Sequence, residues 1–335
     1  MDEITEETFK YTKKIDTLEL QLCPELIDKD YLTKLTTTLR NIRKDIFDTY
    51  GVPIPPVKIT CCDESFSNPD IQIKIFITGY CIKEIDKQIK PDAIPGIIYN
   101  TAKYNLPCFI TASTIEKFYK EVEEDNPTLV TRLKSYDESY AVVRRVLKDL
   151  VSDYIPLNNM PLIFESILDS YALLEIIDRS YWDKISTARL ELAPFYITTF
   201  INSNRELFFF DTSEEIKNYL ISIYYANKQS YERDFFEPLK KEIEKILKNN
   251  PNAIFVLDMP EEQRHFYHCS LKPYFPDLIM IRKDELNKAR QFSPFETKLI
   301  KSIDIPIPEK DKPVENKQEK KKTPWIKKIF KKFKK

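Results

Sequence analysis

The chain has 335 residues, of which 42 % are hydrophobic and 13 % aromatic, so its composition excludes a disordered protein and supports packed cores. The formal net charge is −1, but residues 320–335 contain nine lysines and no acid, which leaves about −10 for the rest. The N-terminus lacks a secretory signal and no apolar run reaches the roughly 20 residues that cross a bilayer, so we expect a cytoplasmic protein that does not span the membrane.

The first long helix is predicted from about Tyr31 to Tyr50. Five apolar residues recur at spacings of three and four and form one stripe: Leu32, Leu35, Leu39, Ile42 and Ile46. Asp30 stands at the expected N-cap, and Gly51 follows the last periodic residue, where a helix commonly ends in a left-handed conformation. The prolines that follow prevent the helix from continuing, so we expect an extended strand over 56–61.

The next strand is predicted over Ile71–Thr78, where four isoleucines alternate with other residues and share one face. We expect the apolar stripe of the first helix to cover that face. An irregular region is then expected to about Pro107, followed by a short strand over 108–111. Ser113, with Glu116 three residues later, predicts a helix that opens with a capping box.

The pattern is helical from Asn126 to about Leu192 and then alternates between strands and helices. The predicted elements are, in order, strands over 195–201 and 206–211, helices over 213–223 and 232–247, a strand over 252–258, a helix over 261–271 and a strand over 277–281. The last three form a strand, helix, strand unit, which most often gives a parallel pair with a right-handed crossover. From about Lys301 the sequence has too few apolar residues to pack and predicts a flexible spacer.

These elements predict an α+β fold made of several small subdomains and a flexible basic tail. The expected units are an N-terminal lead over 1–17, an α/β subdomain over 18–125 with a short insert at about 80–107, a helical subdomain over 126–195, an α/β subdomain over 196–300, a linker over 301–316 and a basic amphipathic tail over 317–335. Hinges between subdomains are expected in a chain built this way.

Residues that usually carry catalysis are sparse. With three glycines, the chain has no GxxxxGK[ST] or GxGxxG phosphate loop, and it has no GxSxG nucleophile elbow. His265 and His268 stand three residues apart, but no second cluster completes a four-coordinate metal site, and the six cysteines lack CxxC spacing. The acid-rich stretches YDESY and PEEQ are predicted to be solvated helix starts. We therefore predict no catalytic residue, no metal, no cofactor and no enzymatic activity.

The C-terminal segment TPWIKKIFKKFKK is amphipathic. On a helix, five apolar residues fall on one face: Trp325, Ile326, Ile329, Phe330 and Phe333. Lysines crowd the remaining surface, among them Lys327, Lys328, Lys331 and Lys332. This sorting is typical of a helix that lies on an anionic membrane surface. Nucleic-acid binding and a solubilising tail without a partner are the alternatives, but a phosphate-binding arm does not need its apolar residues on one face.

Five stretches in one order carry a family resemblance: LELQLCPELI, YGVPIPPVKI, IQIKIFITG, VLKDLVSDYIPLNNM and NAIFVLDMPEEQRHFYHCSLKPYFPDLIMIRKDEL. Together they resemble the cytoplasmic domain of the FHIPEP family, the export-gate proteins of flagellar and type III secretion systems. The most specific stretch is the fourth, residues 146–160, which is similar to the family's Val-Leu-x-x-Leu-Leu-x-Glu-x-Val-Pro-Ile-Arg-Asp run. The resemblance covers roughly residues 18–286.

The resemblance implies four small subdomains and a docking platform that assembles as a ring and receives export chaperones with their cargo. The family's transmembrane half has no counterpart here, so we do not expect the chain to be the gate itself. The family's chaperone-binding dimple would border the segment ITASTIEKFYK. There Phe118 stands at the position of the dimple threonine, and Ile110 keeps the apolar character of its neighbour. Ile110 and Phe118 are therefore the candidates for a partner-binding cleft.

The leading hypothesis is a non-catalytic docking protein that binds export chaperones, secreted subunits or export-apparatus components. We expect it to form a homo-oligomer and to be held at the inner face of the membrane by its tail, and we do not expect a nucleic-acid partner. The alternative is a regulatory or structural ring protein that no longer handles export cargo. Asn158 and Asn159, which replace the family's charged Arg-Asp pair, are among the departures that keep this alternative open.

Overall fold

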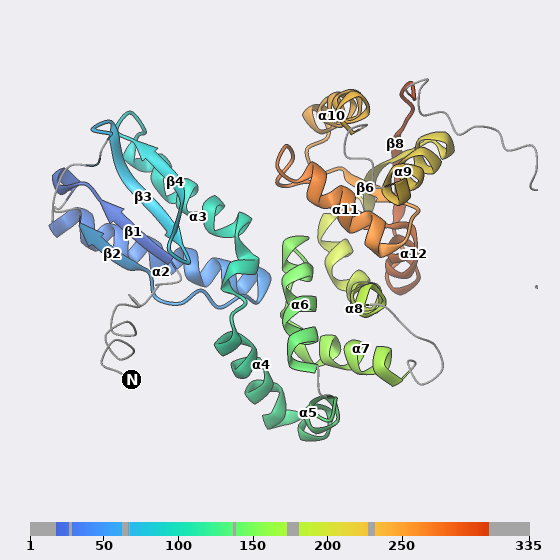
Figure 1. Ribbon diagram of the computed structural model, residues 1–335, viewed down its shortest axis with the longest axis horizontal. Helices are drawn as coiled ribbons and strands as arrows, with labels where there is room; N and C mark the ends of the chain where they lie inside the picture. The colour runs from blue at the N-terminus through green and yellow to red at the C-terminus, as the bar shows by residue number, and fades with distance from the viewer. Residues whose placement is uncertain are drawn as a thin grey trace, which may run out of the picture.

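The computed structural model describes residues 18–26, 29–61, 66, 68–136, 139–172, 181–226 and 232–307. Within these residues the chain is a mixed α+β protein in which two four-stranded sheets flank a group of helices (Figure 1). This architecture confirms the predicted fold class. Among the described residues, no helix combines the length and the apolar composition needed to cross a bilayer.

The N-terminal sheet has the strand order β2-β1-β3-β4. Its strands are β1 (Leu18–Leu22), β2 (Lys58–Cys61), β3 (Ile71–Ile77) and β4 (Tyr80–Asp86), and its helices are α2 (Lys29–Tyr50) and α3 (Ile94–Tyr104). β1 pairs in parallel with β2 and antiparallel with β3, and β3 pairs antiparallel with β4.

The predicted cover of the β3 isoleucines by the α2 stripe is confirmed for most of these residues. Leu35, Leu39, Ile42 and Ile46 of α2 are buried in one core with Ile73, Ile75 and Ile77 of β3. Ile71 instead packs in a small separate cluster with Cys23 and Phe66. A register irregularity between Ile71 and Ile73 breaks the strict alternation that the prediction assumed.

The region 80–107 is regular rather than irregular, and this corrects the prediction. Thr78 and Gly79 both have positive φ, at 50° and 84°, and form the two-residue turn between β3 and β4. Most side chains of β4 are exposed, so the strand lacks the alternation that would have revealed it. In α3, Ile94, Ile98 and Ala102 are buried at helical spacing, but Pro95 and Gly96 masked this pattern.

The helical group consists of α4 (Ala112–Asp125), α5 (Pro127–Lys134), α6 (Ser139–Ser152), α7 (Met160–Ala172) and α8 (Tyr181–Tyr196). α4 packs against α5, α6 and α7, so we describe it with this group. The strand predicted over 108–111 is wrong, because a 3-10 turn at Leu106–Phe109 buries its apolar side chains instead. The capping box of α4 is formed by Thr111 and Thr114 rather than by Ser113 and Glu116.

The C-terminal sheet has the order β7-β6-β5-β8, and all of its pairs are parallel. Its strands are β5 (Glu206–Thr212), β6 (Ile254–Leu257), β7 (Met280–Arg282) and β8 (Glu296–Ile303), and its helices are α9 (Glu214–Ala226), α10 (Glu232–Asn249), α11 (Glu261–Leu271) and α12 (Lys283–Phe292). The predicted parallel strand, helix, strand unit is confirmed by β6, α11 and β7. One face of the sheet joins the main core and the other forms a second core with α9, α10 and α11.

Two further predictions about this half are wrong. Residues 195–201 are not a strand: α8 continues to Tyr196 with Pro194 inside it, and a 3-10 turn over Ile197–Phe200 follows, because Tyr196 and Ile197 are buried on a helical face. The spacer does not begin at 301, because β8 runs to Ile303 and the next alternate isoleucines are buried in the second core. The predicted tail, residues 317–335, lies outside the described residues.

Candidate partner-binding site

Both predicted cleft residues lie in the main core. Ile110 is 0 % exposed and Phe118 is 5 % exposed. Phe118 belongs to the buried face of α4, whereas other residues of that helix border a surface hollow. The helix that the sequence analysis singled out therefore borders a hollow, but it does so with side chains other than Phe118. The predicted membrane-binding residues 325–333 lie outside the described residues, so their role stays a prediction.

The hollow beside α4 is a groove with tyrosines at its base, which we call the tyrosine groove. Its volume is about 380 Å³ and its lining comes from α4, α5 and α6: Glu116, Tyr119, Lys120, Glu123, Lys134, Tyr136, Ser139 and Tyr140. The rings of Tyr119 and Tyr140 stack with centroids 5.9 Å apart and planes inclined by 11°. Lys134 Nζ lies 5.7 Å from the centroid of Tyr119 and donates to the Glu123 carboxylate at 3.0 and 3.1 Å. Stacked rings with a charged rim suit a partner that brings an apolar side chain.

The Tyr119 hydroxyl has no hydrogen-bond partner among the described residues, although the residue is only 4 % exposed. Burial raises the pKa of Tyr119, and the interaction of its hydroxyl with the Ser139 side chain opposes this shift. Tyr140 differs, because its hydroxyl donates to the Ala112 carbonyl oxygen. The Tyr119 ring, rather than its buried hydroxyl, is therefore the part of this residue that lines the groove.

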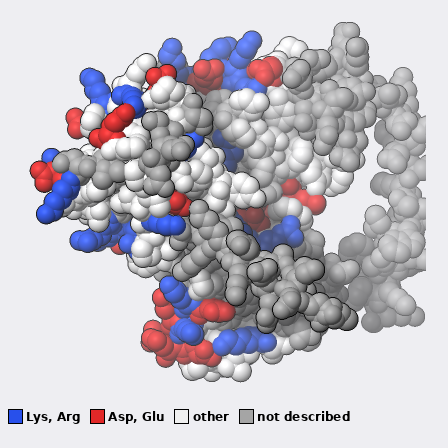
Figure 2. Space-filling model, turned by 60° about the vertical axis from the view of Figure 1, so that its left-hand side comes forward, with Lys and Arg blue, Asp and Glu red and all other residues white. Residues whose placement is uncertain are grey.

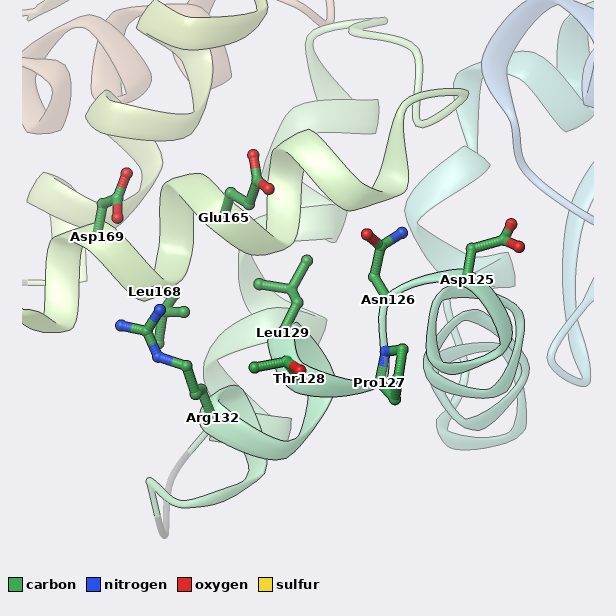
Figure 3. A pocket seen from close by; sticks show the side chains of 9 residues that line it. All are labelled: Asp125, Asn126, Pro127, Thr128, Leu129, Arg132, Glu165, Leu168 and Asp169. Carbon is green, nitrogen blue, oxygen red and sulfur yellow. The ribbon is translucent and has the colours of Figure 1, made fainter.

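A second hollow, which we call the acidic hollow, lies between the α4–α5 junction and α7. It has a volume of about 450 Å³ and is lined by Asp125, Asn126, Pro127, Thr128, Leu129, Arg132, Glu165, Leu168 and Asp169. Figure 3 shows Glu165 and Asp169 on successive turns of α7, projecting to the same side of that helix, with Leu129 and Arg132 on the neighbouring α5. Like charges four residues apart on a helix repel each other, so a cation placed between them is favoured.

A buried ionic cluster lies between these helices and the C-terminal sheet. It contains three carboxylates and three guanidinium groups, those of Asp153, Glu261, Glu285, Arg189, Arg264 and Arg282, with His268 and Tyr196 at its edge. Asp153 follows α6, Arg189 lies on α8, and the others belong to the C-terminal unit. The cluster therefore joins the helical group to the C-terminal sheet.

Every charged member of the cluster has at least one partner of opposite charge. Arg189 Nε and Nη2 donate to the two oxygens of Glu285 at 2.7 and 3.1 Å, and Arg189 Nη1 also donates to Asp153. Arg264 donates to Asp153 Oδ2 at 2.5 Å and to both oxygens of Glu261. The Met280 carbonyl accepts from both Arg189 and Arg264 at 3.2 Å. Pairing of opposite charges is the condition under which buried charges are tolerated.

Three pKa shifts show how burial and neighbouring charges oppose each other in the cluster. Burial alone would raise the pKa of Asp153, but Arg264, His268 and Arg189 hold it well below its usual value. Burial likewise opposes ionisation of Glu285, but Arg189 and the other guanidinium groups lower its pKa to about 2. Burial lowers the pKa of His268, whose Nδ1 lies 2.6 Å from Asp153 Oδ1. Asp153 and Glu285 are thus ionised at neutral pH, and burial favours the neutral form of His268.

The residues after Asp153 contact the N-terminal sheet unit as well. The Leu157 N–H donates to the Tyr50 carbonyl at 2.9 Å, and Asn158 Nδ2 donates to the Asp48 carbonyl at 3.0 Å. Both acceptors are carbonyls of the last turn of α2, which a helix leaves without internal partners. Gly51, with φ +67°, lies so close that an added Cβ would stand 2.8 Å from the Leu157 carbonyl carbon.

Tyr154, the residue after Asp153, contacts both the C-terminal unit and the N-terminal unit. Its backbone has a positive φ of 60°, which is uncommon for a residue other than glycine. Its hydroxyl donates to the Pro276 carbonyl at 2.8 Å, and its ring lies 6.0 Å from the ring of Tyr50. Beside it, Lys103 of α3 pairs with Asp277 at 2.6 Å. Residues 153–158, which we call the joint, thus contact all three parts of the molecule.

The two histidines do not form a metal site. His268 faces Asp153, whereas His265 Nε2 lies 3.4 Å from the Cys269 sulfur, and the His265 ring is 5.0 Å from that of Trp182. In the part of the chain that the structure describes, no group of three or more histidine, cysteine, aspartate or glutamate side chains is placed to hold a metal ion.

Comparison with known protein families identifies the family of this chain. The model of the FHIPEP family matches residues 89–291, which is more than half of the chain. The chain belongs to the FHIPEP family. No curated protein sequence matches it.

Solved structures of similar fold cover nearly the whole of the described chain. The nonameric SctV-C of EPEC has a TM-score of 0.67 at 14 % identity, over 86 % of this chain and 98 % of that chain. The MxiA protein of Shigella flexneri has a TM-score of 0.66 at 15 % identity, over 86 % and 99 %. The CdsV protein of Chlamydia pneumoniae has a TM-score of 0.66 at 13 % identity, over 88 % and 99 %. At these identities the likeness establishes the fold.

The FHIPEP-like stretch 146–160 contains the joint. Its Asp153 belongs to the ionic cluster and stands where the family's run has its acidic residue. Its Leu157 and Asn158 donate hydrogen bonds to the end of α2. The sequence did not reveal the cluster, and the prediction that PEEQ is solvated is wrong, because Glu261 is buried. A signal was present: Arg189 stands four residues after Ile185 and three before Leu192, on the apolar face of the helix, where an arginine requires a buried partner.

Proposed function

We propose that the chain is a non-catalytic docking component of a type III or flagellar protein-export apparatus. FHIPEP membership, together with one fold shared over almost the full length of SctV-C, MxiA and CdsV, supports this assignment. The surface that it offers to protein partners is the α4 side, where the tyrosine groove and the acidic hollow lie. Its location is the cytoplasm, at the inner face of the membrane.

We also propose that the chain assembles into a homo-oligomeric ring. The solved SctV-C and EscV cytosolic domains are nonameric, and their folds match this one. A structure of CdsV in complex with the CdsO protein, which matches with a TM-score of 0.63, shows that a protein of this fold binds another protein. Protein partners of this chain are therefore export chaperones, secreted subunits or other export components.

The docking role is tested with the full-length chain as bait in a crosslinked pull-down from its native cell. Export chaperones, secreted subunits or export-ring proteins are expected among the captured proteins. A matched bait carrying Glu116→Lys and Lys120→Glu keeps the net charge and inverts the charges on the groove side of α4. It is expected to lose the partners that bind there, while it keeps its own oligomeric contacts. Capture of the chain's own copies alone would favour the ring protein without export cargo.

We propose that the tail associates with the membrane surface. The sorting of Trp325, Phe330 and Phe333 away from the lysines supports interfacial binding, and each lysine adds about 1 kcal/mol near an anionic leaflet. The full-length protein is expected to co-float with vesicles that contain anionic lipid and to stay at the bottom of the gradient with neutral vesicles. Removal of residues 317–335 should abolish flotation. Equal flotation with and without the tail would refute this part of the proposal.

A further inference from the structure

The outer side of α2 carries a row of basic side chains. Lys29, Arg40 and Lys44 are exposed, and they lie three turns and then one turn apart, so they stand above one another on the helix. Phe47 continues the row and is 50 % exposed. The buried stripe of α2 faces the N-terminal sheet, so this row points into solvent. We call the row, with the threonines along it, the basic face of α2: Lys29, Thr33, Thr36, Thr37, Arg40, Lys44 and Phe47.

A shallow hollow lies on this face. Its volume is about 520 Å³, and its lining is Lys29, Leu32, Thr33, Thr36, Thr37 and Arg40. The three threonine hydroxyls donate to backbone carbonyls four residues earlier, at 2.9, 2.8 and 3.0 Å, so their oxygens can only accept further hydrogen bonds. The lining thus combines two cations, acceptor oxygens and a leucine, without an acid. A segment that brings carboxylates, backbone N–H groups and apolar side chains is complementary to it.

The three cations of the basic face lack acidic partners. Elsewhere on the N-terminal unit, Lys87 pairs with Glu25 at 2.5 Å, and Figure 2, in which this unit is turned toward the viewer, shows basic and acidic side chains interspersed over the surface. No cation of the basic face forms an ion pair with another residue of the described part of the chain. Arg40 and Lys44 stand four residues apart, so their like charges repel each other. An anionic ligand relieves this repulsion.

We propose that the chain's own N-terminal segment, residues 2–9, docks on the basic face of α2. Its sequence is DEITEETF, which contains four acids, no lysine or arginine, and the apolar side chains Ile4 and Phe9. Lysines follow at residues 10, 13 and 14, so the N-terminal lead is sorted into an acidic block and a basic block. The acidic block carries the charge that complements the basic face, and Phe9 supplies an apolar partner for Phe47.

The length of the chain allows this contact. Residues 1–17 lie outside the described residues, and the described chain begins at Leu18, which is buried in the same core as the apolar stripe of α2. Residues 10–17 span at most about 29 Å when extended, and a helix with its side chains is about 10–12 Å across, so the segment can pass round α2. Residues 2–9 also span at most about 29 Å, close to the roughly 27 Å along α2 from Lys29 to Phe47.

The topology gives the docked segment a direction. β1 and β2 are parallel neighbours joined through α2, so α2 runs opposite to both strands, and Leu18 at the start of β1 lies toward the C-terminal end of the helix. The segment therefore enters beside the end of α2 and runs antiparallel to it. Phe9 lies near Phe47, the acids at 6 and 7 near Lys44, and the acids at 2 and 3 near Lys29.

The docked segment neutralises a basic surface of the body. While the segment is bound, the basic face is closed to an anionic membrane and to an acidic partner, and such a ligand must displace it. The docking of residues 2–9 does not depend on the proposed function.

A zero-length carbodiimide crosslinker, which joins a carboxylate to a lysine in direct contact, tests the docked segment in the whole chain. Crosslinks are expected from the acids at 6 and 7 to Lys44 and from those at 2 and 3 to Lys29. In a mixture of isotopically light and heavy chains these links should join residues of one chain, and they should weaken as salt screens the exposed charges. Links only between chains, links spread evenly over the lysines of the body, or none from residues 2–7 would overturn the proposal.

Two surface variants make the test specific. Arg40→Glu with Lys44→Glu should lower the links to Lys29 by about threefold to tenfold, as expected for the loss of exposed ion pairs. The matched control Lys117→Glu with Lys120→Glu makes the same change of charge at exposed positions of α4 and should leave these links unchanged. All four side chains are exposed, so native circular dichroism is expected for each protein. An equal loss in both variants would show a nonspecific effect of net charge and would overturn the assignment to α2.

Reversal of charge on both sides tests for direct contact. Glu6→Lys with Glu7→Lys, added to Arg40→Glu with Lys44→Glu, places opposite charges across the contact again, so the links to Lys29 should recover most of the loss. Links that stay as low as in the α2 variant alone would overturn the proposal. No vesicle and no export partner enters these measurements, so a failure of the proposed function would leave their outcome unchanged.

Discussion

Replacement of Asp153 by alanine is expected to destabilise the protein by about 3–5 kcal/mol, the cost of removing one partner from a buried ion pair. Asp153 accepts from Arg264 and Arg189 and contacts His268, and all of these side chains are buried. Its removal leaves the cluster with one more positive charge than negative charge in a medium that solvates charge poorly. Urea unfolding measured by circular dichroism checks the free energy.

The matched control is Asp169→Ala, which removes an exposed carboxylate from α7. It is expected to change the free energy of unfolding by less than about 0.5 kcal/mol. Asp153→Asn should fall between the two, since it keeps a polar group of the same size but loses the charge. If Asp153→Ala and Asp169→Ala unfold at the same urea concentration, the cluster does not hold the helical group against the C-terminal sheet.

The loss of stability expected from Asp153→Ala arises at the boundary between two parts of the chain. Arg189 belongs to α8, Arg264 to α11 and Glu285 to α12, so the cluster is where the helical group meets the C-terminal unit. The paired charges of the cluster therefore favour one position of the helical group against the C-terminal unit, which the proposed docking role would require.

Local patterns predicted the elements whose burial has a simple period. The α2 stripe and the β3 isoleucines repeat at 3.6 and 2 residues, and both are buried accordingly. The parallel β6–α11–β7 unit followed from three short runs with clear boundaries. Prediction failed where burial is one-sided or absent. β4 is an edge strand with an exposed surface, and residues 195–201 form the end of a helix despite their β-branched composition, because Tyr196 and Ile197 pack into the core.

The candidate site was less accessible to sequence reasoning, because it depends on side chains brought together from distant segments. The sequence pointed to α4, but which face of α4 is buried depends on α5, α6 and α7. The structure places Phe118 in the core, whereas Tyr119 borders the groove. The ionic cluster joins residues up to 132 positions apart along the chain, from Asp153 to Glu285, through Arg189. Neither a period nor a motif within one segment records such a contact.

Replacement of Gly51 by alanine is expected to destabilise the protein by about 2–5 kcal/mol, for two independent reasons. Gly51 ends α2 with φ +67°, a conformation that costs an alanine about 1–2 kcal/mol. The new Cβ would also stand 2.7 Å from Asn158 Oδ1 and 2.8 Å from the Leu157 carbonyl carbon, and overpacking of this kind costs about 1–3 kcal/mol. Thermal and urea unfolding measure the loss.

Gly96→Ala is the matched control, because it makes the same chemical change in a different setting. Gly96 lies within α3, and a Cβ added there meets no atom within 4 Å. Alanine is expected to stabilise this helix by about 0.5–1 kcal/mol, so the two variants should shift the unfolding midpoint in opposite directions. Equal destabilisation would mean that glycine is needed only for chain flexibility. Opposite shifts would establish that Gly51 is required by the close approach of α2 to the joint, where the N-terminal unit contacts the rest of the chain.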